Sequence, residues 1–137
     1  MDFDTWDLTA QSPFGADPIW RMKALRMAIY LLDLTWEDAR QLCRWRLTDP
    51  VAMQLYRAVG SIGSNLMEGY SRSSGVDRVR FYEYSLGSTR ESQLWYYAGR
   101  HILKEAVVRA RMDLLTRIKQ LVHTAIPRER QRVIRPG

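Results

Sequence analysis

The chain has 137 residues and a mass of 16.1 kDa, which suits one domain with a sizeable buried core. Hydrophobic residues make up 46% and charged residues 26%, which excludes a disordered chain, and no apolar run approaches the ~18 residues that cross a bilayer. Twenty-one basic against 15 acidic residues give a net charge of +6, while one cysteine and two histidines exclude a thiolate zinc cage, so we expect no metal site and no cofactor.

The first 17 residues carry four aspartates and no lysine or arginine, whereas residues 100–137 carry ten basic residues against three acidic ones. Phe3, Trp6 and Phe14 follow no helical or strand period, so we interpret residues 1–17 as an acidic arm with aromatic anchors. The arm and the basic end could pair within a chain or between subunits, or the basic end could bind nucleic acid. Simple solvation of both ends is the alternative.

A first helix is predicted from Asp17-Pro18, where aspartate caps and proline occupies the first turn. Neither glycine nor proline interrupts residues 19–49, so we expect this helix to be long, with Cys43 packed as a small hydrophobe. Thr48-Asp49-Pro50 then marks a break and the start of a second helix, over residues 50–73. Apolar residues three or four positions apart form a stripe along the first helix, and the stripe is interrupted once, after Leu34. Its members are Trp20, Ala24, Met27, Leu31 and Leu34, and then Ala39 and Leu42.

Two further helices are predicted over residues 76–99 and 104–125, the first of them preceded by the turn Ser73-Ser74-Gly75. Pro127 is expected to end the last helix, which leaves residues 126–137 as a basic tail. Strand signals are missing from the sequence. Four helices with short connections predict an all-α, antiparallel up-down-up-down four-helix bundle over residues 18–125.

Small residues gather in the middle of the second helix, although each glycine inside a helix costs about 1 kcal/mol relative to alanine. If the turn centres between Ser74 and Gly75, Gly60 lies near Gly87, and small residues of the second and third helices face each other. We therefore predict a close helix–helix contact with a few polar groups satisfied inside it. The residues given this structural role are Gly60, Ser61, Ser64, Asn65, Glu68, Arg72, Gly87 and Ser88. A catalytic role for this serine-rich segment lacks a nearby histidine base or a phosphate-cradling loop.

Residues 57–72, together with Trp20, Phe81 and residues 86–91, resemble a family of bacterial four-helix-bundle proteins. These are often called intervening-sequence proteins, because some are encoded within insertions in large-subunit ribosomal RNA genes. The resemblance covers residues 18–125 and implies a barrel-like homopentamer. The family is similar to the accessory variability determinant of diversity-generating retroelements, which implies a basic pentamer that binds nucleic acid and a reverse transcriptase. The segment 35–49 is longer here than the family's first connection and adds two tryptophans and several arginines.

Arginine outnumbers lysine by 18 to 3, which favours a polyanionic partner because the guanidinium fork matches phosphate; a GC-rich genome is the other explanation. We predict nucleic-acid contacts at the basic residues around the fourth helix: Arg100, Lys104, Arg109, Arg111, Arg117, Lys119, Arg128 and Arg130. The alternative is a solvated face with intrahelical pairs such as Asp113–Arg117.

Trp95, Tyr96 and Tyr97 are three consecutive aromatic residues, of which one helix can bury only one or two in its own core. We predict that this set contributes to an oligomer interface; a base-stacking platform is the alternative.

The expected function is that of a non-enzymatic, cytoplasmic, oligomeric nucleic-acid-binding accessory protein. RNA or DNA, further copies of the chain and a reverse transcriptase or another protein are the expected partners, and a membrane is not. The alternative is an oligomeric protein scaffold that does not itself bind nucleic acid. An enzyme is set aside, because the sequence offers no constellation of carboxylates or histidines.

Overall fold

The computed structural model describes residues 1–9 and 13–132, and every regular element in these ranges is helical, which confirms the predicted all-α class. In chain order the elements are α1 (Phe3–Thr9), the 3-10 helix η1 (Pro18–Arg21), α2 (Lys23–Cys43), α3 (Asp49–Tyr70), α4 (Gly75–Ala98), the 3-10 helix η2 (Gly99–His101) and α5 (Glu105–Arg130). Within the described ranges, no helix carries an apolar stretch long enough to cross a membrane.

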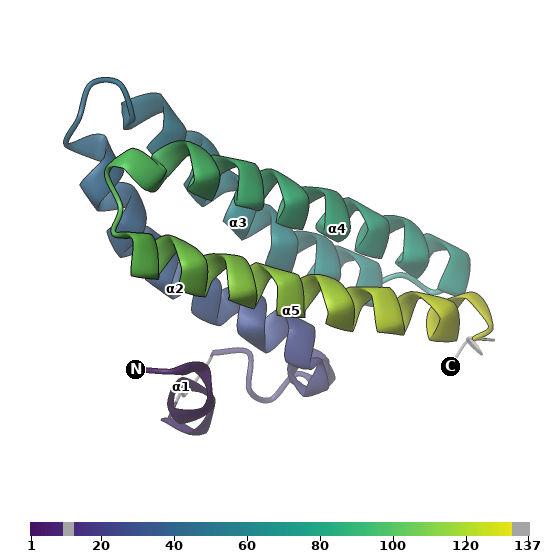
Figure 1. Cartoon of the computed structure of the whole chain (residues 1–137). Coiled ribbons are helices and arrows are strands. Elements are labelled where there is room, and N and C mark those ends of the chain that lie inside the picture. The colour runs from purple at the N-terminus through teal and green to yellow at the C-terminus, as the bar shows by residue number, and fades with distance from the viewer. Residues whose placement is uncertain (10–12, 133–137) are drawn as a thin grey trace.

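The four long helices form an elongated helical bundle, with successive connections at alternate ends (Figure 1). α3 packs against both α2 and α4, and α5 packs against α4 and less extensively against α2. The core runs along one face of α4 and α5, where Tyr82, Leu115 and Ile118 are at most 1% exposed. In α3 it includes Val59 and Ile62, whereas Met53 is 71% exposed.

The first predicted helix is shorter than expected at both ends. The Asp17 side chain accepts a hydrogen bond from the Ile19 amide at 3.0 Å and starts η1, but Met22 is extended and separates η1 from α2. α2 then ends at Cys43 without glycine or proline, because the Thr48 hydroxyl donates to the Leu42 carbonyl at 2.6 Å and holds the chain in a tight reversal. Cys43 is exposed at this helix end, so its predicted packed position is wrong.

The N-terminal arm contains a helix, α1, where the sequence predicts irregular chain. Its aromatic residues anchor it to α2 and η1: the Trp6 ring lies 5.5 Å from that of Tyr30 in α2 and 6.4 Å from that of Trp20 in η1. Asp7 forms an ion pair with Arg26 of α2 at 2.9 Å. The acidic arm therefore pairs with α2 of its own chain and not with the basic end of α5.

The last helix does not stop at Pro127 but continues through it to Arg130, so the predicted tail is wrong for residues 126–130. Proline removes one backbone donor from the helix. Packing holds the final turns in spite of this loss, because Ile126 is 5% exposed and Glu129 lies 3.7 Å from Arg78 of α4. Residues 131–132 follow the helix, and the last part of the predicted tail, residues 133–137, lies outside the described residues.

Candidate nucleic-acid interface

The basic residues predicted to bind nucleic acid divide into free, paired and buried groups. Lys104, Arg117 and Arg128 are exposed and have no ion pair within the described part of the chain, so the expected Asp113–Arg117 pair does not form. Arg109 pairs with Glu105 at 2.8 Å, but both side chains are more than two-thirds exposed, and such a surface pair restrains the guanidinium only weakly.

Two further residues of the predicted set have neighbours on α4. Arg130 lies 3.6 Å from Glu83, with both side chains more than half exposed. Lys119 is half-buried and donates to the Gln93 side-chain oxygen at 3.4 Å. Both keep a positive charge near the surface of α5, but neither is as open as Arg117.

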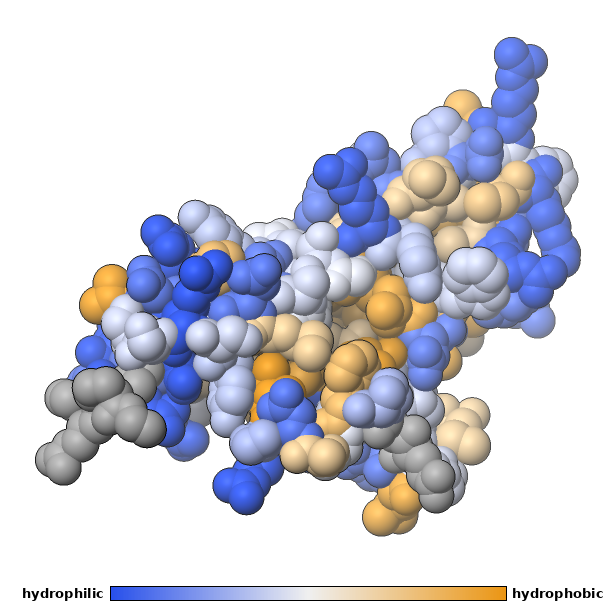
Figure 2. Space-filling model, turned by 180° about the vertical axis from the view of Figure 1, so that it is seen from behind, coloured by the Kyte–Doolittle hydropathy of each residue, from blue (hydrophilic) through white to orange (hydrophobic). Residues whose placement is uncertain are grey.

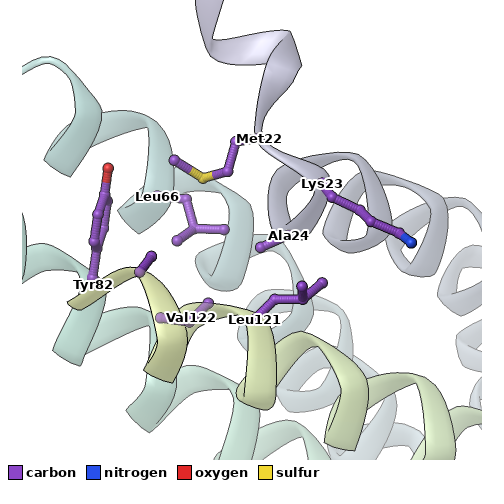
Figure 3. Close-up of a pocket in the computed structure, with 8 residues that line it drawn as sticks. Met22, Lys23, Ala24, Leu66, Tyr82, Leu121 and Val122 are labelled. Atoms are coloured by element: carbon purple, nitrogen blue, oxygen red, sulfur yellow. The ribbon is translucent and has the colours of Figure 1, made fainter. Parts of the chain in front are cut away.

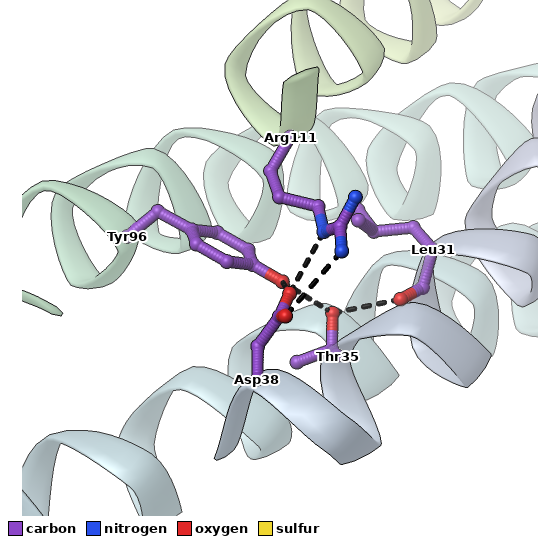
Figure 4. A network of polar contacts seen from close by, with 5 residues as sticks. All are labelled: Leu31, Thr35, Asp38, Tyr96 and Arg111. Carbon is purple, nitrogen blue, oxygen red and sulfur yellow. Dashed lines mark hydrogen bonds and ion pairs between the residues drawn. The ribbon is translucent and has the colours of Figure 1, made fainter. Parts of the chain in front are cut away.

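Arg111 is not part of an exposed surface, which corrects its assignment. Its side chain is 16% exposed and reaches Asp38 of α2, with Nε to Oδ2 at 2.8 Å and Nη2 to Oδ1 at 3.3 Å (Figure 4). Burial works against the charged form, but the hydrogen bonds and charge of Asp38 outweigh it and raise the pKa of Arg111. This guanidinium is committed to an internal carboxylate and cannot serve a phosphate.

Tyr96 belongs to the same buried network and not to an oligomer interface. It is fully buried, and its hydroxyl donates to Asp38 Oδ2 at 2.6 Å, while Thr35 Oγ1 lies 2.9 Å from the same hydroxyl (Figure 4). Burial first, and then the charge of Asp38, raise the pKa of Tyr96 far above its usual range, so the hydroxyl stays protonated as a donor. The network joins α2, α4 and α5 in the interior.

For Trp95 and Tyr97, the other two aromatic residues of the triplet, the role in an oligomer interface stays a prediction. Trp95 is half-buried, and its indole nitrogen is buried without a hydrogen-bond partner. Tyr97 is 55% exposed, and the guanidinium carbon of Arg100 lies 3.9 Å from its ring centroid. A cation held this close to an aromatic face is a cation–π pair.

The predicted glycine contact between α3 and α4 is wrong. A Cβ on Gly60 would face Leu32 of α2 at 4.0 Å, and a Cβ on Gly87 would meet nothing within 4 Å. The close approach of α3 and α4 occurs instead at Gly69, where a Cβ would lie 2.8 Å from the Tyr82 ring. A second cross-helix contact is the hydrogen bond from the Ser85 hydroxyl to the Ile62 carbonyl at 2.9 Å.

The polar residues of this segment bond mostly within their own helix. The Ser61 hydroxyl donates to the Arg57 carbonyl, and the side chains of Ser64 and Asn65 both donate to the Ser61 carbonyl. The remaining members add two local contacts: Glu68 pairs with Arg72 at 3.0 Å, and Ser88 accepts at its carbonyl from the Ser92 hydroxyl. These residues therefore do not satisfy one another inside the contact between α3 and α4 as predicted; the polar bond that crosses between the two helices is made by Ser85, outside the predicted set.

A cavity of about 100 Å³ lies where α2, α3, α4 and α5 meet. Figure 3 shows its lining side chains, which are apolar apart from Tyr82 and Lys23, and the Lys23 amine points away from the others. The Tyr82 hydroxyl is buried without a hydrogen-bond partner in the described part of the chain, and burial, followed by the charge of Glu129, raises its pKa to about 12. An apolar lining of this kind offers neither a nucleophile nor an acid–base pair.

Basic residues missed by the sequence analysis lie in the connection between α2 and α3. Arg44 and Arg46 are exposed, have no ion pair within the described ranges, and flank Trp45, which is 57% exposed. Figure 2 shows long hydrophilic side chains projecting from this end of the molecule, whereas apolar side chains gather in the middle of the same face. The signal in the sequence was the basic and aromatic enrichment of this connection.

Comparison with known proteins gives one match. The model of a family described as 23S rRNA-intervening sequence protein matches residues 21–125. Neither the curated proteins nor the solved structures contain a match to this chain.

Proposed function

Since this chain belongs to the family of 23S rRNA-intervening sequence proteins, we propose that it is a non-enzymatic, oligomeric accessory protein that binds RNA or DNA. The observation that carries the proposal is the set of exposed cations that have no carboxylate partner among residues 1–9 and 13–132, among them Lys104, Arg117 and Arg128. Arginine and lysine in this state are free to replace the counterions that surround nucleic-acid phosphates.

Binding of this kind positions a nucleic acid without reading its bases, because contacts to phosphate carry no sequence information. The net charge of +6 supports it, since several copies in one assembly multiply the positive field around the protein. The resemblance to retroelement accessory proteins adds a reverse transcriptase as a candidate protein partner in the cytoplasm.

The assembly that we propose is a ring of antiparallel up-down-up-down four-helix bundles, five in number by the family resemblance. The order in which α2, α3, α4 and α5 pack supports this topology. Trp95 and Tyr97 remain the residues proposed for the contact between copies. The exposure of Tyr97, which is 55%, supports the idea, because the ring is open to a second copy.

Purification without nuclease tests the proposal directly. We expect nucleic acid to copurify at low salt, to leave as salt rises, and light scattering to give a mass above that of one chain. The logarithm of the binding constant should fall linearly with the logarithm of salt, by roughly 0.9 per phosphate contact on duplex DNA. A monomer free of nucleic acid at low salt would overturn the proposal.

A pair of variants on α5 then identifies the contacting surface. Arg117→Gln should weaken binding and lower the salt slope by about 0.9, because one phosphate contact is lost. Arg109→Gln removes the same charge from the same helix, but the Glu105 carboxylate, 2.8 Å from that guanidinium, offsets part of its positive field, so we expect a smaller effect. Equal effects of the two variants would show that net charge alone, and not the free cations, drives binding.

The alternative is a scaffold that binds proteins only. Three large side chains along α4 favour it, since Tyr84, Leu94 and Tyr97 are each more than half exposed. A partner protein retained at high salt, in a complex without nucleic acid, would support the scaffold over the nucleic-acid-binding function.

A further inference from the structure

One end of the bundle combines basic and aromatic residues from two connections. The α2–α3 connection, residues 44–48, and the α4–α5 connection lie at this same end (Figure 1). The two connections are in contact through the helix ends, because a Cβ on Gly99 would lie 3.0 Å from the Leu42 side chain. We call Arg44, Trp45, Arg46, Arg100 and Lys104 the loop-end surface.

The α2–α3 connection is held firmly by backbone hydrogen bonds. The Trp45 amide donates to the Leu42 carbonyl at 3.3 Å, and the Trp45 carbonyl accepts from the amides of Thr48 and Asp49 at 3.1 and 2.9 Å. Thr48 is 7% exposed and its hydroxyl is bonded to the Leu42 carbonyl at 2.6 Å. The connection is therefore pre-organised, and little entropy is lost when its side chains engage a partner.

Trp45 is 57% exposed in this rigid reversal, between two arginines that lack ion pairs within the described chain. An exposed indole beside free guanidinium groups matches the way in which proteins bind single strands, where bases stack on aromatic faces and cations follow the backbone. Arg100, held 3.9 Å above the Tyr97 ring, supplies a further planar cation at the same end.

The carboxylates at this end do not neutralise the loop-end surface. Three of them pair with arginines outside it: Asp38 with Arg111, Glu37 with Arg40 and Glu105 with Arg109. Asp49 sits in the first turn of α3, where a carboxylate complements the positive end of the helix dipole. The surface therefore presents positive charge around an open aromatic face.

We propose that the loop-end surface binds single-stranded nucleic acid, with an unpaired base stacked on Trp45 and the adjoining phosphates on Arg44, Arg46, Arg100 and Lys104. This inference rests on the proposed function and narrows it to a strand whose bases are accessible. In a duplex the bases are stacked inside the helix, so an exposed indole would contribute nothing to phosphate contacts. Among acidic partners, a nucleic acid fits better than an acidic peptide because it offers flat faces as well as charge.

The test uses the full chain and two fluorescent RNA probes of equal length, an unstructured polyuridine strand and a closed hairpin duplex, in anisotropy titrations at fixed salt. Trp45→Ala should lower affinity for the single strand about tenfold and leave affinity for the duplex unchanged. Leu47→Ala is the matched control: it truncates an 89% exposed side chain in the same connection, and should change either affinity by less than about twofold. Circular dichroism of each variant checks that the helices are intact.

Two further arms complete the design. Trp45→Phe should restore most of the single-strand affinity, because it keeps an aromatic face, and a polythymidine strand of the same length shows whether DNA is bound equally. Equal losses for strand and duplex, or equal effects of Trp45→Ala and Leu47→Ala, would overturn this inference while nucleic-acid binding itself stands. Absence of binding to every probe at low salt would overturn the proposed function as well. Salt-insensitive capture of a protein through Trp45 would assign the surface to a protein partner and overturn the inference.

Discussion

The buried network around Asp38 and the loop-end surface lie in the same half of the bundle, and both contain arginine. In the network, Arg111 is 16% exposed and bonded to a carboxylate from another helix. At the loop end, Arg44 and Arg46 are exposed, and Glu37 and Glu105 pair with other arginines. Charge and residue type are the same in the two regions, so the position of the nearest carboxylate decides whether an arginine holds the fold or remains free for a partner.

The largest expected difference between the two regions is in the free energy of unfolding, after removal of the Asp38 carboxylate. Asp38→Ala leaves the Arg111 charge buried without its carboxylate and removes the acceptor of the Tyr96 hydroxyl, which keeps only Thr35, so we expect a loss of about 3–5 kcal/mol in the free energy of unfolding. Arg44→Ala, at an exposed position without an ion pair, should change it by less than about 0.5 kcal/mol. Urea unfolding followed by circular dichroism measures both. Similar stabilities of the two variants would remove the distinction drawn here.

Two glycines allow the same comparison between a tightly packed position, Gly69, and an open one, Gly87. Gly69→Ala would place a Cβ 2.8 Å from the Tyr82 ring and 2.9 Å from the Phe81 Cβ, and should destabilise the fold by about 1–3 kcal/mol. Gly87→Ala meets nothing within 4 Å in the middle of α4, and should stabilise the fold by up to about 1 kcal/mol. Thermal melts of the two variants should therefore shift in opposite directions. A stabilising Gly69→Ala would contradict the close contact between α3 and α4.

The smallest effect concerns Tyr82, which is buried like Tyr96 but whose hydroxyl has no partner. Its pKa is raised to about 12 in the folded chain, above the ordinary value of 10.0. The stabilising contribution of the protonated form is complete below pH 10 and is lost as pH rises toward 12. At pH 11 the wild type should therefore have lost roughly 1 kcal/mol more stability than Tyr82→Phe, relative to pH 8. Urea titrations at the two pH values measure this, and equal losses would show that the Tyr82 hydroxyl meets solvent.

Much of the fold could be predicted from short sequence signals. Pro50 marks the start of α3, and Ser74 caps α4 by accepting from the Asp77 amide at 3.2 Å. These signals act over one turn of helix, so they do not depend on how the helices pack. The prediction that the last helix ends at Pro127 is wrong because it ignores how the helices pack. The packing of Ile126 and Glu129 against the bundle keeps the chain helical beyond the proline.

The candidate site was predicted less well, because it depends on which helix faces which. The glycine pairing placed Gly60 near Gly87, and the hydrogen bond from Ser85 to Ile62 fits that register, since each glycine lies two residues further from the turn. The register does not fix how each helix is rotated about its own axis, and the side of α3 that carries Gly60 faces Leu32 of α2. The spacing of residues along one helix cannot reveal such a rotation.

The buried network corresponds to an interruption of the apolar stripe in the sequence, which the structure explains. The apolar stripe of the first helix slips between Leu34 and Ala39, and the positions that would fill it hold Thr35 and Asp38. Both are at most 3% exposed, so the buried face of α2 is continuous, and two of its positions hold polar side chains. A carboxylate in a core stripe signals a cation on a facing helix, although only the fold identifies Arg111 as that cation.

The docking of α1 on α2 has a consequence for optical measurements on this protein. Trp6 and Trp20 lie with Tyr30 in the aromatic cluster of the arm, while Trp36 and Trp45 are more than half exposed. Emission from these four indoles will accordingly follow the attachment of the first helix and events at the surface, whereas Trp95, which packs against the core, reports the melting of the interior. A shift in emission that precedes the loss of ellipticity would record the arm lifting from an otherwise intact bundle.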